Sequence, residues 1–299
     1  MSDTWLIIAL IALAATSANL AVVLTAMEAR RVPIESNLRA SMLTKLVRRP
    51  MWRLAAALDL GGWILKTLAL LVAPLTIVAP GMALGLFLLV GFSYIVLHER
   101  VKGSALVGIA LLAGGVALVA VHSPERTTTT AGAGRWAVVV VVLLAGALAV
   151  FVMSRRGTRV DPRIIAVSVG CAWALNGVLS KLMADSLDTG RWLFFAIALA
   201  SAVSVGALGY TAKTSALQAG QATTVESIVA VINTLVPVAL APVLFGEAWP
   251  SDPGAASQLG LGLIFVGIGV WLLTRSSADV YSGPVPRSAP APQVQKSEG

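Results

Sequence analysis

Apolar segments about as long as a bilayer is thick recur along the chain, with short polar stretches between them. A membrane-spanning helix needs roughly 20 apolar residues, because backbone groups cannot stay unpaired in hydrocarbon. Pro74 and Pro80, with Gly81, divide the longest apolar block into two helices. The pattern therefore predicts about nine spans, at Trp5–Ala26, Trp52–Leu75, Val78–Leu97, Ser104–Val121, Trp136–Met153, Ile164–Met183, Trp192–Gln218, Thr223–Phe245 and Gln258–Leu273.

The composition supports a membrane protein and excludes other classes. Of 299 residues, 57% are apolar and only 12% are charged, against about 25% charged in globular domains. This balance excludes a soluble enzyme, a disordered chain and a disulfide scaffold. The single cysteine, Cys171, leaves no disulfide, and the histidines His98 and His122 form no ligand pair.

Sequence motifs of enzymes and pumps are absent from the chain. We find no HExxH, no GxSxG and no Walker motif, so we expect no enzyme, no cofactor, no metal centre and no ATP-driven pump. The net charge of +8 lies in short runs between apolar segments. We therefore expect a lipid bilayer as the partner of this charge, and no nucleic acid.

The distribution of lysine and arginine predicts the orientation in the membrane. Fifteen of them fall in the first loop, in alternate later loops and in the C-terminal tail, whereas the opposite side receives only Arg126, Arg135 and Arg191. The positive-inside rule then places the N-terminus outside and the C-terminus inside. The first apolar segment lacks a basic n-region, so we expect it to remain as a span rather than to be a cleaved signal peptide. The expected location is the cytoplasmic (inner) membrane of a bacterium.

Two segments lie outside the predicted spans. Within the basic cytoplasmic loop 28–51, Ile34–Val47 carries apolar residues at helical spacing, and the sequence leaves open a helix along the headgroups or a plain loop. Residues 276–299 are rich in serine and proline, which is typical of a disordered tail.

The two halves of the chain resemble each other. The stretch Lys66–Leu70 recurs as Lys213–Leu217, and Asn19 and Asn176 occupy comparable places in the helices that open each half. An apolar helix ending in a glutamate follows in each half, at Glu99 and Glu247, and then a glycine-rich helix.

Spans one to four thus correspond to spans six to nine, with span five as a connector that inverts the second copy. The expected fold is an all-α membrane protein built from two inverted four-helix repeats. Such repeats are the architecture of secondary transporters. The expected divisions are a first repeat at 1–122, a connector at 123–162, a second repeat at 163–275 and a tail at 276–299.

Several stretches carry a family resemblance. The turns Leu97-His-Glu-Arg100 and Phe245-Gly-Glu-Ala248, each before a glycine-rich helix, resemble those of the drug/metabolite transporter (EamA-like) superfamily. The nine-span layout, the stretch Ala73–Pro80 and the segment Val121-His-Ser-Pro124 resemble NIPA-type magnesium transporters. The resemblance implies this fold and a transport role. The chain departs from these relatives at Lys66, where they carry a neutral polar residue.

Few ionisable residues lie inside the predicted spans, and each is a candidate for function because a charge in the bilayer is costly. Lys66 and Lys213 either face a shared cavity and bind an anionic group, or they snorkel or pair locally, Lys66 with Asp59 and Lys213 with Glu226 or the inner headgroups. Asp59 and Glu226 are candidate proton or cation carriers, with structural ion pairing as the alternative.

Other polar and special residues have two interpretations each. Asn19 and Asn176 line a cavity or bond between helices. Lys181 is predicted to pair with Asp185 on the surface, four residues on, and Glu99 and Glu247 to cap turns or pair with loop cations. Prolines within or beside spans are candidate kinks for gating, at Pro74, Pro80, Pro237 and Pro242.

We therefore expect a multi-pass secondary transporter that moves a small anionic or zwitterionic solute by alternating access. The alternative is a transporter of magnesium or another divalent cation, and a third class is a lipid-linked substrate flippase or accessory membrane protein. A lateral apolar groove would favour lipid, and an enclosed polar pocket would favour a soluble metabolite. The sequence leaves open whether the protein forms a homodimer.

Overall fold

The computed structural model is built from helices, as the sequence predicts. It describes residues 2–31, 45–97, 103–122, 125–156, 160–247 and 249–278, and within these ranges every regular element is a helix. The elements are α1 (Ser2–Ala29), α3 (Pro50–Val72), α4 (Leu75–Ala83), α5 (Gly85–Leu97), α6 (Gly103–Val121), α7 (Ala133–Arg155), α8 (Pro162–Asp188), α9 (Trp192–Ala219), α10 (Ala222–Phe245) and α11 (Pro253–Ala278).

The expected spans and the observed helices agree closely. In the described part of the chain, eight helices are long and apolar enough to cross a membrane, α4 and α5 together counting as one. The remaining expected span, Ser104–Val121, corresponds to α6. The all-α membrane fold is confirmed. Glu99, the tail 279–299 and most of Ile34–Val47 lie outside the described residues.

The second expected span, Trp52–Leu75, is three residues too long. Ala73 and Pro74 adopt extended backbone, so α3 ends at Val72 and α4 begins at Leu75. Proline lacks the amide hydrogen that a helix interior requires, and it disfavours helical backbone in the residue before it. The third span is itself divided, because α4 ends at Ala83, one turn after Pro80.

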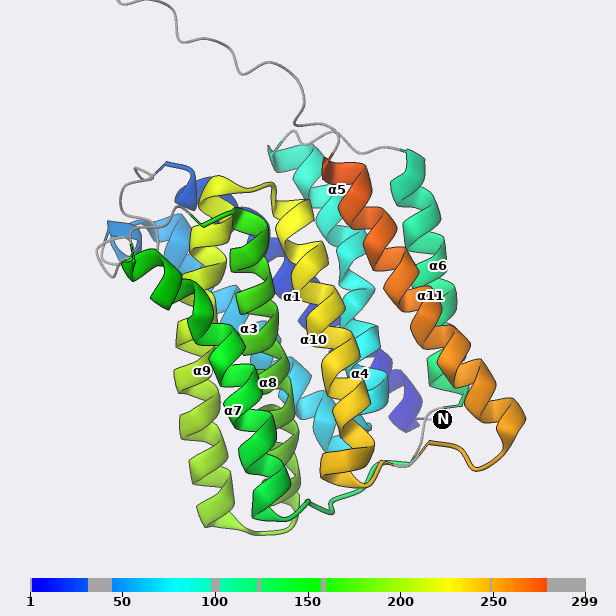
Figure 1. The fold of residues 1–299 in the computed structure, drawn as a ribbon. Helices are drawn as coiled ribbons and strands as arrows, with labels where there is room; N and C mark the ends of the chain where they lie inside the picture. The colour runs from blue at the N-terminus through cyan, green and yellow to red at the C-terminus, as the bar shows by residue number, and fades with distance from the viewer. Residues whose placement is uncertain are drawn as a thin grey trace, which may run out of the picture.

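The helices of the two halves run in opposite directions. Figure 1 shows α1 rising from the N-terminus while α8 descends, and likewise α3 descends while α9 rises. The strongest packing within each half joins α1 to α3 and α8 to α9, and across the halves α3 packs on α8 and α1 on α9. Each of these contacts thus has a counterpart in the other half.

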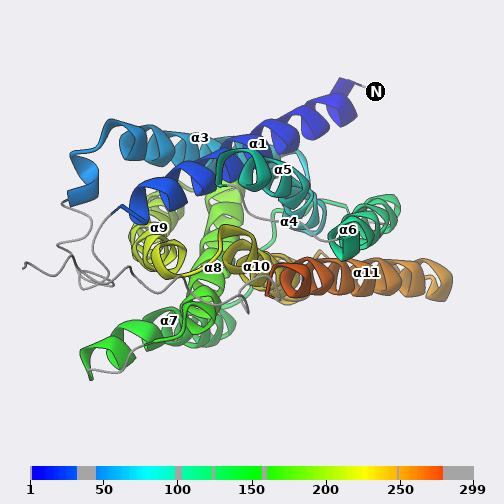
Figure 2. The ribbon, with the colours of Figure 1, turned by 90° about the horizontal axis from the view of Figure 1, so that it is seen from above.

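Helix α8 is the central helix of the bundle. Viewed along the bundle, α8 and α10 lie among the other helices, with α7 at one edge and the pair α6 and α11 at another (Figure 2). Of the most apolar window of α8, 78% is buried inside the protein. Polar side chains on α8 are therefore held away from lipid.

Glycines bring α6 and α11 into backbone contact. A Cβ on Gly115 would lie 2.6 Å from the carbonyl oxygen of Gly262, and one on Gly269 would lie 2.6 Å from that of Gly108. These distances are shorter than any side chain tolerates, so only glycine allows the helices to pack this closely. These glycines therefore serve helix packing, as small residues commonly do between membrane helices.

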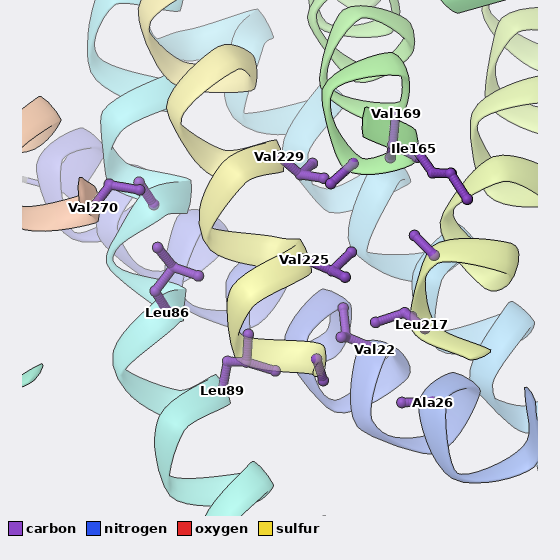
Figure 3. Close-up of a cluster of buried hydrophobic side chains, with 14 of the residues drawn as sticks. Val22, Ala26, Leu86, Leu89, Ile165, Val169, Leu217, Val225, Val229 and Val270 are labelled. Atoms are coloured by element: carbon purple, nitrogen blue, oxygen red, sulfur yellow. The ribbon is translucent and has the colours of Figure 1, made fainter. Parts of the chain in front are cut away.

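An apolar cluster fills the bundle toward the end opposite the N-terminus. Figure 3 shows Val22 and Ala26 of α1 facing Leu217 of α9 and Val225 of α10, with Leu86 of α5 close by. These side chains are almost completely buried. The cluster therefore closes the space between α1, α5, α9 and α10 at this level of the bundle.

Candidate functional site

A cavity of about 120 Å³ lies between α1, α3, α8, α9 and α10, and residues of α4 and α5 complete its wall. The six polar residues that the sequence singled out come together on its wall, although they belong to five helices. They are Asn19, Asp59, Lys66, Asn176, Lys213 and Glu226.

The spacing of residues along α3 explains how one helix supplies several of the lining groups. Asp59, Trp63 and Lys66 lie four and three residues apart, and all three line the cavity. Residues at this spacing share one face of an α-helix. The same rule applies on α10, where Glu226 and Asn233 are seven residues apart and both face the cavity.

Lys213 is held between two carboxylates from different helices. Its Nζ lies 3.5 Å from Oδ1 of Asp59 on α3 and 3.4 Å from Oε1 of Glu226 on α10. The ammonium also lies over the ring of Trp173, 5.6 Å from its centroid. The pairing of Lys213 with Glu226 is confirmed. The alternative that Asp59 pairs with Lys66 is wrong, because helix crossing brings Lys213 to Asp59 instead.

Lys66 lines the same cavity in a different way. Its side chain is buried, 9% exposed, yet it forms no hydrogen bond or ion pair with any residue that the structure describes. Gly177 of α8 makes room for it, since a Cβ there would lie 3.4 Å from the Lys66 Nζ. No carboxylate of the described chain therefore lies within ion-pair distance of the Lys66 ammonium, and Asp59 acts on its charge only from farther away.

Amide side chains complete the polar wall. Asn176 donates from Nδ2 to the carbonyl oxygen of Ala202 on α9, at 2.8 Å, so it both bonds between helices and lines the cavity. Asn19 donates to Ala15 of its own helix at 2.7 Å. The Oδ1 atoms of Asn176 and Asn233 are buried without a hydrogen-bond partner in the described chain.

A second group of charged side chains lies near the end of the bundle that carries the N-terminus. Lys181 of α8 pairs with Asp185 at 3.0 Å and with Glu247 at 3.3 Å, and Arg126 pairs with Asp185 at 2.9 Å. We call Arg126, Lys181, Asp185 and Glu247 the end network. The predicted pair of Lys181 and Asp185 is confirmed, but its surface location is wrong, because both side chains are completely buried.

Glu247 also caps a helix, which confirms its predicted capping role. Its carboxylate accepts hydrogen bonds from the backbone amides of Leu75 and Thr76 and from the Thr76 hydroxyl, at 3.2, 3.4 and 3.0 Å. A carboxylate at a helix N-terminus satisfies free amides and the helix dipole. The start of α4 is thereby tied to the end of α10. Arg126 and Thr76 were missed because no local pattern marks a contact between distant loops.

An apolar groove opens beside the cavity, between α3 and α9. It encloses about 320 Å³ and is lined largely by apolar and aromatic side chains, Trp52, Leu60 and Val203 among them. Asp59, Trp63, Trp173 and Asn176 line both the groove and the cavity, so the two spaces share a wall. No pattern in the sequence predicts this groove, because its two walls are far apart in the chain.

The candidate kink residues lie outside the polar wall. Pro74 precedes α4 and Pro80 lies within it, whereas Pro237 and Pro242 lie within α10, which continues unbroken. In the described ranges, no three histidine, cysteine, aspartate or glutamate side chains gather as a metal site would require.

One comparison links the chain to a known protein. It is 26% identical over 254 residues to a protein of Arabidopsis thaliana named "Probable magnesium transporter NIPA9". The match covers 81% of this chain and 74% of that protein. No family model matches the chain. No solved structure matches it either.

Proposed function

We propose that the chain is a secondary transporter that moves a small solute through the central cavity, and that Lys66 binds an anionic group of that solute. One observation carries the proposal. Lys66 is a buried ammonium on the cavity wall with no hydrogen bond or ion pair in the described chain. A charge in such a place is costly unless it is used, so it marks a substrate pathway. A carboxylate or phosphate oxygen supplies the missing partner.

The arrangement of the helices supports alternating access. We infer two inverted repeats, α1 to α6 and α8 to α11, with α7 as the connector between them. The antiparallel course of α1 and α8, and of α3 and α9, agrees with this division (Figure 1). In inverted-repeat transporters the substrate site lies between the repeats, as this cavity does, and the repeats rock around it. The proposal also includes a fold of the drug/metabolite transporter type. It places the chain in a bacterial inner membrane, with the N-terminus outside.

Transport by purified protein in liposomes tests the role of Lys66. We expect uptake of an organic anion from a panel of carboxylates and phosphate esters, and at least a tenfold loss in Lys66→Met. Lys66→Arg should retain part of it. Lys45→Met, which removes an exposed lysine outside the cavity, is the matched control. Wild-type transport of no anion, or full uptake by Lys66→Met, would contradict the proposal.

Magnesium transport is the second candidate, and the name of the similar Arabidopsis protein favours it. The carboxylates of Asp59 and Glu226 on the cavity wall are the kind of ligand that Mg²⁺ takes, one or two at a time with water. Two ammonium groups on the same wall oppose a divalent cation. Uptake of Mg²⁺ by the wild-type protein in the same liposomes, without uptake of any anion, would replace the first candidate by this one.

The groove between α3 and α9 is relevant to the third function class, a flippase of lipid-linked substrates. A purely soluble metabolite needs only the polar cavity, whereas an amphipathic anion could place its apolar part in the groove and its charge near Asp59 and Lys66. Within the panel, we therefore include anions that share one head group and differ in apolar chain length. Stronger uptake of the longer members would assign the protein to amphipathic substrates.

A further inference from the structure

Lys213 occupies the place that a bound cation would take between two carboxylates. Its ammonium lies 3.5 Å from Asp59 Oδ1 and 3.4 Å from Glu226 Oε1, and the three side chains come from α9, α3 and α10. All three are at least 85% buried, with side-chain exposures of 6, 15 and 12%. The carboxylates are thus set on two separate helices, and the cation between them is supplied by a third.

The carboxylates need that cation. Two buried like charges facing one position repel each other, and removing the charge between them leaves both uncompensated. Aspartate and glutamate oxygens are ligands of hard divalent cations, which commonly keep several waters and bind one or two carboxylates. A further oxygen without a partner belongs to a residue of the same cavity wall. Asn176 is 2% exposed, and its Oδ1 has no hydrogen-bond partner in the described chain.

We propose that Asp59 and Glu226 form a divalent-cation site that Lys213 fills from within the chain. Lys213 is then the residue that excludes divalent cations from the cavity. The proposal rests on the proposed function only in taking this cavity as the solute pathway. It explains how a cavity with two carboxylates serves a solute other than a metal ion.

Substitution of Lys213 should open the site. Its ammonium is the far end of a flexible stem, so Lys213→Ala vacates the position while the helices that carry the carboxylates remain. We expect Lys213→Ala in detergent at pH 8 to bind one Mn²⁺ per chain, measured by electron paramagnetic resonance, at least tenfold more tightly than the wild type. Adding Asp59→Asn or Glu226→Gln should abolish this binding. Lys213→Arg, which keeps a cation in place, should bind no Mn²⁺.

Lys66→Ala is the matched control, because it removes the other ammonium of the same cavity without vacating the space between the carboxylates. It should bind Mn²⁺ no better than the wild type. The proposal is wrong if folded Lys213→Ala gains no Mn²⁺ site, if the gained site survives Asp59→Asn and Glu226→Gln together, or if the wild type already binds Mn²⁺ there.

Thermal melting tests the same proposal if Lys213→Ala is too unstable for the binding measurement. Millimolar Mg²⁺ should raise the melting temperature of Lys213→Ala and of Lys213→Met, and leave that of the wild type unchanged. No shift in either variant would also overturn the proposal. Binding and melting are measured without transport, so their failure leaves the Lys66 assignment untouched, and loss of the Lys66 assignment leaves this result standing.

Discussion

Lys181 and Glu247 form a completely buried ion pair, with Nζ 3.3 Å from Oε1, that joins the middle helix of the bundle to the end of α10. Asp185 shares the same ammonium at 3.0 Å, and Glu247 holds the first amides of α4. One lysine therefore links α8, α10 and α4 near the end that carries the N-terminus. The neighbouring side chains exclude water from Lys181. The two charges can therefore separate and become hydrated only if this end of the bundle opens.

Loss of Lys181 should destabilise the protein strongly. Lys181→Met leaves Asp185 with Arg126 as its remaining cation and removes the ion-pair partner of Glu247, and we expect a loss of about 3–5 kcal/mol in the free energy of unfolding. Adding Glu247→Gln should recover part of the loss. Thermal melting in detergent measures both. Equal stability of Lys181→Met and wild type would show that the end network contributes little.

The two cavity lysines should differ in their effect on stability. Lys213→Met leaves Asp59 and Glu226 uncompensated, and we expect a loss of about 3–5 kcal/mol in metal-free buffer. Lys66→Met removes a buried charge without a carboxylate partner, so the melting temperature should stay level or rise. Equal losses in the two variants would indicate that Lys66 is also held by a structural partner.

The packing of α6 on α11 gives a prediction with a close control. Gly269→Ala places a Cβ 2.6 Å from a backbone oxygen of α6, so the helices must separate, at a cost of about 1–3 kcal/mol. Gly260→Ala, on the same helix, has nothing within 4 Å of its Cβ. Melting of both variants checks the contrast. A loss for Gly260→Ala as large as that for Gly269→Ala would contradict it.

The orientation in the membrane remains a prediction from the loop charges. A reporter active only in the cytoplasm should work when fused after Arg275 and fail when fused after Ser2. The two positions lie at the ends of α11 and α1. Activity at the N-terminal fusion and none at the C-terminal one would reverse the assignment.

Most of the fold could be predicted because span length and proline position are local signals. An apolar run of about 20 residues needs no knowledge of its neighbours to be identified as a span. The error at Leu75 is local too, since an apolar residue after Pro74 was counted with the helix before it instead of the one after it.

The sequence predicts which charged residues form the site, but not which of them form ion pairs with one another. Charged residues in spans are rare, so Asp59, Lys66, Lys213 and Glu226 stood out in the sequence. Their partners depend on how helices cross, and spacing along α3 alone favoured Lys66 for Asp59. Lys181 and Asp185 show the same limit, because the i, i+4 rule predicts the contact but only the central place of α8 makes it buried.

The backbone contact between α6 and α11 has a consequence for movement. In the proposed division, these helices belong to different halves, and their backbones meet directly at the interface glycines. The pair lies at the edge of the bundle, away from the cavity (Figure 2). If the halves reorient around the cavity, this contact is the part of their boundary that we expect to move least.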